Sequence, residues 1–177
     1  MTLPASPHTA TDAENLTAAL AQLDRIQGLF GRAEGKASFL MAVDLALLGS
    51  VAVSFPVPAP VSPAGISGVI AASLLGFSLI NLYASFYPHL RNPKPSILYF
   101  ADIAALGSDT YRRQLRGTSS ADLADDALCQ VWRNAEILDK KFKRSRSAFL
   151  LIAAALPFWL ATLALATARS SSIPGLG

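Results

Sequence analysis

The sequence predicts an all-α integral membrane protein with three transmembrane helices and a cytoplasmic helical module. Three apolar stretches indicate the spans: residues 37–57, 66–87 and 147–168 contain 21 or 22 residues each, and Asp44 is their one charged residue. A helix of that length covers roughly 32 Å at about 1.5 Å per residue, which matches a hydrocarbon core about 30 Å thick. Charged residues make up 15% of the chain, against about 25% in soluble domains, so a single soluble core is disfavoured.

The basic residues predict how the chain is oriented. Of its 15 Lys and Arg residues, three precede the first apolar stretch and eleven lie between Arg91 and Arg146, whereas the connector 56–65 has none. The positive-inside rule therefore places the N-terminus and segment 88–146 in the cytoplasm and the tail 169–177 outside. The chain has a net charge of +3. Its basic residues are expected to set the membrane topology and to contact anionic lipids, so they do not indicate nucleic-acid binding.

The sequence gives no support for a cleaved signal peptide or for disulfide bonds within the chain. The 36 residues before the first stretch contain acidic residues and are too long for the basic start of a cleaved signal peptide. The lone Cys129 cannot form an intrachain disulfide, so nothing indicates an oxidising compartment.

The N-terminal part predicts a flexible lead over residues 1–10 and a cytoplasmic amphipathic helix over 11–36. Thr11 and Glu14 fit a capping box at its start. An apolar stripe on this helix comprises Leu16, Leu20, Leu23, Ile26, Leu29 and Phe30. The first span then ends at an extracytoplasmic proline-rich turn over 58–65, because prolines cannot continue the helix.

Segment 88–146 predicts further cytoplasmic helices. A helix capped by Ser96 is expected over 97–106, a short one over 111–115, and a long one from Ala121 through the third span. The long helix has apolar residues in heptad spacing at Ala124, Leu128, Val131, Ala135, Leu138 and Phe142. This seam requires a partner, which is either the 11–36 helix or the same helix of another subunit. The tail 169–177, rich in Ser, Gly and Pro, is expected to be disordered.

No catalytic or metal-binding constellation is present in the sequence, so an enzyme is not expected. Asp44 is the most informative single residue, because a carboxylate inside a span costs about 2.5–3.5 kcal/mol on insertion scales. It is expected to face the bundle interior, a pore or water. Two roles are open: an ion pathway, or a structural acid that pairs with Ser78 or Asn81.

Basic residues on the cytoplasmic helices predict an anion-binding surface. Arg112 and Arg116 share one helix face, and a second face contains Lys141 and Arg144 with Arg133 and Lys140 beside it. Such faces can bind a phosphate. The simpler alternative for the cluster next to the third span is a topology signal in contact with lipid headgroups.

Three motifs resemble a known family. Residues 33–40 (AEGKASFL), 92–104 (NPKPSILYFADIA) and 130–142 (QVWRNAEILDKKF) are similar to the transmembrane effectors of bacterial Pycsar anti-phage systems, and the resemblance covers about residues 15–168. Asp44 and Pro157 are not features of that family pattern, so their roles are open.

The resemblance implies a multi-pass protein of the cell inner membrane, and the positive-inside rule gives it a cytoplasmic N-terminus and a periplasmic C-terminus. A pyrimidine nucleotide cyclase would make cyclic UMP or cyclic CMP on infection, and the effector, expected to be a homo-oligomer, would respond by impairing the membrane and arresting or killing the cell. The chemistry of the basic helix faces, and not the resemblance, gives the candidate ligand residues Arg112, Arg116, Arg133, Lys140, Lys141 and Arg144, with Asp44 as a functional candidate within the membrane. No cofactor, metal or direct nucleic-acid binding is expected. The alternative is a membrane scaffold that recruits a partner through the Leu16 and Leu128 stripes.

Overall fold

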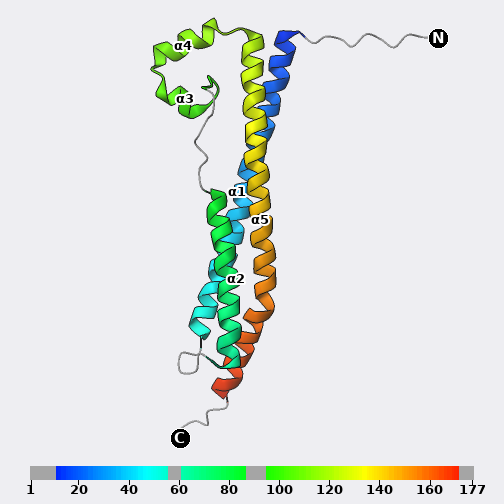
Figure 1. The fold of residues 1–177 in the computed structure, drawn as a ribbon, viewed down its shortest axis with the longest axis vertical. Helices are drawn as coiled ribbons and strands as arrows, with labels where there is room; N and C mark the ends of the chain where they lie inside the picture. The colour runs from blue at the N-terminus through cyan, green and yellow to red at the C-terminus, as the bar shows by residue number, and fades with distance from the viewer. Residues whose placement is uncertain (1–10, 56–60, 87–94, 172–177) are drawn as a thin grey trace, which may run out of the picture. The chain divides into compact units, whose positions relative to one another are not determined.

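The computed structural model describes residues 11–55, 61–86 and 95–171, and within these ranges it contains helices and no strands (Figure 1). The helices are α1 (Asp12–Ser54), α2 (Pro63–Phe86), α3 (Phe100–Ala105), α4 (Ser108–Gly117) and α5 (Ser120–Ser171). Helices α1, α2 and α5 are long and apolar enough to cross a membrane, which confirms the all-α fold with three spans. The predicted flexible lead, most of the proline-rich turn and most of the tail lie outside the described residues.

The chain divides into two compact units, and α1 and α5 contribute to both. Unit 1 contains residues 11–31 and 95–138, which include α3 and α4. Unit 2 contains residues 32–55, 61–86 and 139–171, which include α2 and the described parts of all three apolar stretches.

The predicted capping box is present at the start of α1. The Thr11 amide donates to Glu14 Oε2 at 2.7 Å, and the Glu14 amide donates to Thr11 Oγ1 at 3.4 Å. The hydrogen bond from the Thr11 backbone lowers the pKa of the Glu14 carboxyl from its usual 4.5. The helix then continues through Gly31 and Gly35 to Ser54, so the two glycines do not end it.

Two apolar clusters form the interior of unit 2. One contains Val51, Leu75 and Ile152 together with Ala71 and Ala155. The other contains Ala37, Leu82 and Ala148. The alanines are at most 2% exposed, and small side chains at such positions let membrane helices approach closely.

Hydrogen bonds between the spans supplement this packing. Ser67 and Thr162 share a bond of 2.9 Å, and Trp159 Nε1 donates to Ser50 Oγ at 2.6 Å. Ser78 Oγ donates to the carbonyl of Ala148 at 3.2 Å. Polar side chains in the spans therefore join α1 and α2 to α5.

The stripe predicted on the N-terminal helix is buried only in part within the single chain. Leu23 and Ile26 are buried, but Leu20 and Leu29 are exposed, and Ala19 is buried instead. Two helices approach each other most closely where their side chains are small. The side of a broad apolar stripe that contains alanine therefore faces the neighbouring helix.

The seam predicted on α5 differs in the same way. Ala124 and Leu138 are buried as expected, whereas Leu128 is 50% exposed and Phe142 is also exposed. Ala127 and Gln130 are buried in their place. The heptad spacing therefore identified the helix but not the full set of residues in contact.

The short helices also differ from the prediction. Helix α3 begins at Phe100 rather than at residue 97, because the Ser96 hydroxyl accepts hydrogen bonds from the amides of Leu98 and Tyr99, both at 3.1 Å, in a separate turn. Helix α4 is longer than expected. The predicted long helix is present, and α5 passes through Pro157 without interruption.

Candidate functional site

Asp126 holds the segment before α3 against α5 within unit 1. Its Oδ2 accepts from Ser96 Oγ at 2.9 Å and from the Ile97 amide at 3.1 Å. Asp102 of α3 accepts from the Ser96 amide at 2.9 Å. Ser96 is buried, so this turn is fixed by two carboxylates, one on α5 and one on α3.

Aromatic contacts add to this attachment. The Arg133 guanidinium of α5 lies 5.5 Å from the centre of the Tyr99 ring, which is within the range of a cation–π interaction. The rings of Tyr99 and Phe100 are tilted, with centroids 4.9 Å apart. Residues from the second and third family-like motifs therefore meet at this point.

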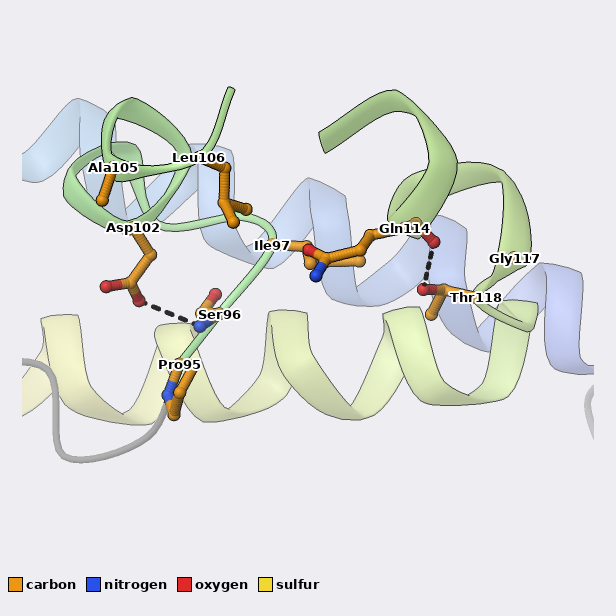
Figure 2. A pocket seen from close by; sticks show the side chains of 9 residues that line it. All are labelled: Pro95, Ser96, Ile97, Asp102, Ala105, Leu106, Gln114, Gly117 and Thr118. Carbon is orange, nitrogen blue, oxygen red and sulfur yellow. Dashed lines mark hydrogen bonds between the residues drawn. The ribbon is translucent and has the colours of Figure 1, made fainter. Parts of the chain in front are cut away.

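A cavity of about 640 Å³ lies beside the Ser96 turn, between it and the helices α3 and α4 (Figure 2). Figure 2 shows Gln114 extending from α4 toward Ile97, and Thr118 Oγ1 bonded to the Gln114 carbonyl at 2.8 Å. The lining residues are Pro95, Ser96, Ile97, Asp102, Ala105, Leu106, Gln114, Gly117 and Thr118. The cavity thus combines an apolar surface with a few polar groups, which is typical of small-molecule sites.

Replacing Asp126 with alanine is expected to release the Ser96 turn. Two hydrogen bonds to a carboxylate are lost, each worth about 1.5–3 kcal/mol, so unit 1 should be destabilised by roughly 3–6 kcal/mol. Hydrogen exchange of the Ile97 amide measures this release. Asp125→Ala is the matched control, because Asp125 is exposed. Equal exchange rates in the two variants would contradict the attachment.

The basic residues predicted in unit 1 lie in different environments. Arg112 and Arg116 are exposed on α4. At about 100° per residue, they lie on the helix face opposite Gln114, so they point away from the cavity. Arg133 is half-buried against Tyr99, next to the segment that lines the cavity.

The basic residues predicted in unit 2 make other contacts. Lys141 Nζ lies 2.9 Å from Glu34 Oε1, with side chains that are 10% and 50% exposed. The Arg144 guanidinium donates to the carbonyl of Ala84. Lys140 is exposed. The six predicted ligand residues are therefore divided three and three between the units, and their role stays a prediction.

Asp44 is completely buried in unit 2, and neither carboxylate oxygen has a hydrogen-bond partner among the described residues. Along α1, Asp44 lies between Ala37, which belongs to one apolar cluster, and Val51, which belongs to the other. Ser78 donates to the Ala148 carbonyl, and Asn81 donates to Phe77 of its own helix, so the expected pairing of Asp44 with Ser78 or Asn81 stays a prediction. The expected interior position is observed.

The sequence reasoning missed Ser96, Asp102, Gln114 and Asp126 as parts of a site. No local signal marks these residues, since residues 117–132 contain Asp126 beside other acids and no Lys or Arg. The described residues contain no group of three His, Cys, Asp or Glu side chains that could hold a metal.

These features define a helical membrane protein with a ligand-sized cavity in the segment between its second and third spans. A family model for the Pycsar effector protein domain matches residues 18–168. The chain belongs to this family of anti-phage defence effectors. The family is not a known enzyme family. The match confirms the resemblance seen in the three motifs. No curated protein and no solved structure gives a significant match. This family and the three apolar helices together fit a protein of the inner membrane.

Proposed function

We propose that this effector binds a cyclic pyrimidine mononucleotide in the cavity of unit 1 and responds by impairing the inner membrane, which arrests growth. The observation that carries the proposal is the cavity of about 640 Å³ inside the family-matched region. Its volume lies within the roughly 300–1,000 Å³ of small-molecule sites. The nucleotide would be cyclic UMP or cyclic CMP, made by a partner cyclase.

The chemistry of the lining suits a pyrimidine base and a ribose. Ile97, Ala105 and Leu106 supply apolar surface for a flat ring. The Gln114 amide can donate to and accept from the polar edge of a base, and Thr118 adds a hydroxyl.

The phosphodiester requires a cation, and Arg133 is the predicted ligand residue best placed to supply it. The Arg133 guanidinium lies against the Tyr99 ring. Tyr99 follows Ser96, which lines the cavity, by three residues. Arg112 and Arg116 face away from the cavity in this structure, so they would contribute to the phosphate site only after α4 rotates. Lys140, Lys141 and Arg144 belong to unit 2, and we propose that they act on the response of the spans.

Coupling to the membrane would proceed through α5, which is one helix from Ser120 to Ser171 and contributes to both units. A ligand shifts an equilibrium between two states only by its difference in affinity for them. The proposal therefore requires that the nucleotide binds the active state more tightly. We further propose that unit 1 is cytoplasmic, as the basic residues predict, and that the active form is a homo-oligomer.

Thermal unfolding of the purified full chain tests the binding step. At a concentration of cyclic UMP or cyclic CMP that is 100 times the dissociation constant, the folded state should gain about 2.7 kcal/mol and the melting temperature should rise. Gln114→Ala should reduce the rise, because a neutral hydrogen bond contributes about 0.5–1.5 kcal/mol, whereas the exposed Gln27→Ala on α1 should retain it in full. A melting temperature that neither nucleotide raises would overturn the proposal.

That negative result would favour the second candidate function, a scaffold that recruits a partner protein through unit 1. The exposure of Leu128 and Trp132, at 50% and 67%, supports this candidate because large apolar side chains in contact with water mark interaction surfaces.

A further inference from the structure

A second cavity, of about 500 Å³, lies between α1 and α5 within unit 2. Two cations and three phenylalanines contribute to its lining. The residues that matter are Gly35, Lys36, Phe39, Phe142, Arg146 and Phe149. We refer to this cavity as the Lys36–Arg146 groove.

The charge of the groove is uncompensated. Lys36 and Arg146 are exposed, and neither forms an ion pair with a residue of the described ranges. The acid nearest in sequence, Glu34, is already paired with Lys141 at 2.9 Å. The groove therefore attracts an anion that the described chain does not provide.

Phe39, Leu40 and Phe149 of the groove lie on the membrane side of these charges, and Phe142 lies on the other side. Lys36 and Arg146 directly precede the first and third apolar stretches, and Phe39 and Phe149 each lie three residues further along. Their rings are 70% and 56% exposed. A ligand that fits has an anionic end at the boundary of the membrane and a hydrocarbon part inside it.

Gly35 keeps the space open. A Cβ atom placed on Gly35 would meet no other atom within 4 Å, so a larger side chain there would extend into free space beside Lys36. Glycine within a helix costs about 1 kcal/mol relative to alanine. The same open surroundings are found at Gly28, which does not line the groove and therefore provides a control.

We propose that the Lys36–Arg146 groove binds one anionic phospholipid, with its phosphate between Lys36 and Arg146 and an acyl chain along Phe39 and Phe149. Charge complementarity selects an anion, and the exposed rings select a hydrocarbon chain over a polar nucleotide. This inference is independent of the proposed nucleotide response, because it requires only that the apolar stretches span a membrane.

Native mass spectrometry of the full chain in detergent micelles tests the proposal with dioleoyl phosphatidylglycerol and dioleoyl phosphatidylcholine at equal concentration. We expect one retained phosphatidylglycerol and no retained phosphatidylcholine. The double variant Lys36→Gln, Arg146→Gln should lower phosphatidylglycerol affinity about 25-fold, since each cation near an anionic headgroup contributes about fivefold. Lys143→Gln is the charge control, because Lys143 is paired with Asp139 at 2.6 Å and is not in the groove.

A second variant tests the groove without changing any charge. Gly35→Leu should fill the space and prevent lipid retention, whereas Gly28→Leu should behave as the wild type. Undiminished retention in Gly35→Leu would overturn the proposal in favour of diffuse attraction. Displacement of phosphatidylglycerol by cyclic UMP would overturn it in favour of a nucleotide site. A change in oligomer mass with unchanged lipid retention would overturn it in favour of a second copy of the chain.

Discussion

Replacement of Asp44 by asparagine is expected to reduce nucleotide-dependent potassium efflux from liposomes, with nucleotide affinity unchanged. The buried carboxylate has no hydrogen-bond partner among the described residues, and an unsatisfied polar group in such a site costs about 1–3 kcal/mol. If the active state admits water to Asp44, that cost is relieved on activation. A substitution that lowers the cost in the resting state should therefore reduce the active population by roughly 5- to 150-fold.

A graded pair of variants strengthens this test. Asp44→Asn removes the charge but keeps a polar group, and Asp44→Leu removes both, so Asp44→Leu should reduce efflux further. Ser73→Ala is the control within the membrane, because in the described part of the chain the Ser73 hydroxyl donates to the Val69 carbonyl of its own helix, at 2.8 Å. Efflux equal to that of the wild type in both variants would show that Asp44 is a packing residue.

Substitution of Lys141 by glutamate is expected to abolish growth arrest in cells supplied with the nucleotide by an inducible cyclase, while membrane insertion is retained. Lys141 is nearly buried and paired with Glu34 on α1. In the variant, two acidic side chains face each other in place of this ion pair. Loss of one partner of a fully buried pair costs about 3–5 kcal/mol. Because Glu34 is half exposed, we expect about 1–3 kcal/mol here.

Exchange of the two charges separates contact from ligand binding. If Lys141 acts through Glu34, the double variant Glu34→Lys, Lys141→Glu should restore growth arrest to a large part of the wild-type level. If Lys141 binds the phosphate, as the sequence predicted, the double variant should stay inactive. Lys143→Glu is the matched control, since Lys143 is 75% exposed and pairs only within α5 among the described ion pairs.

The candidate site could be predicted only in part, for a reason visible in α4. The sequence identified Arg112 and Arg116 as a basic face by their spacing of four, and spacing alone does not show which way a helix face points. The structure turns Gln114, Gly117 and Thr118 toward the cavity, so the arginines lie on the opposite side. Similarly, Asp126 is separated from Ser96 by 30 residues, a pairing that no local pattern indicates.

Local chemistry by itself determined the three spans, the capping box at Thr11 and the long helix that begins near Ala121. Hydropathy over about 20 residues and a side chain that bonds to the nearest turn are properties of short stretches of chain. Only the tertiary structure decided that Asp44 is buried with no hydrogen-bond partner in the described part of the chain, that Lys141 pairs with Glu34, and which sides of α1 and α5 are covered. These depend on how closely alanine-lined helices approach, and that distance is set jointly by residues far apart in the sequence.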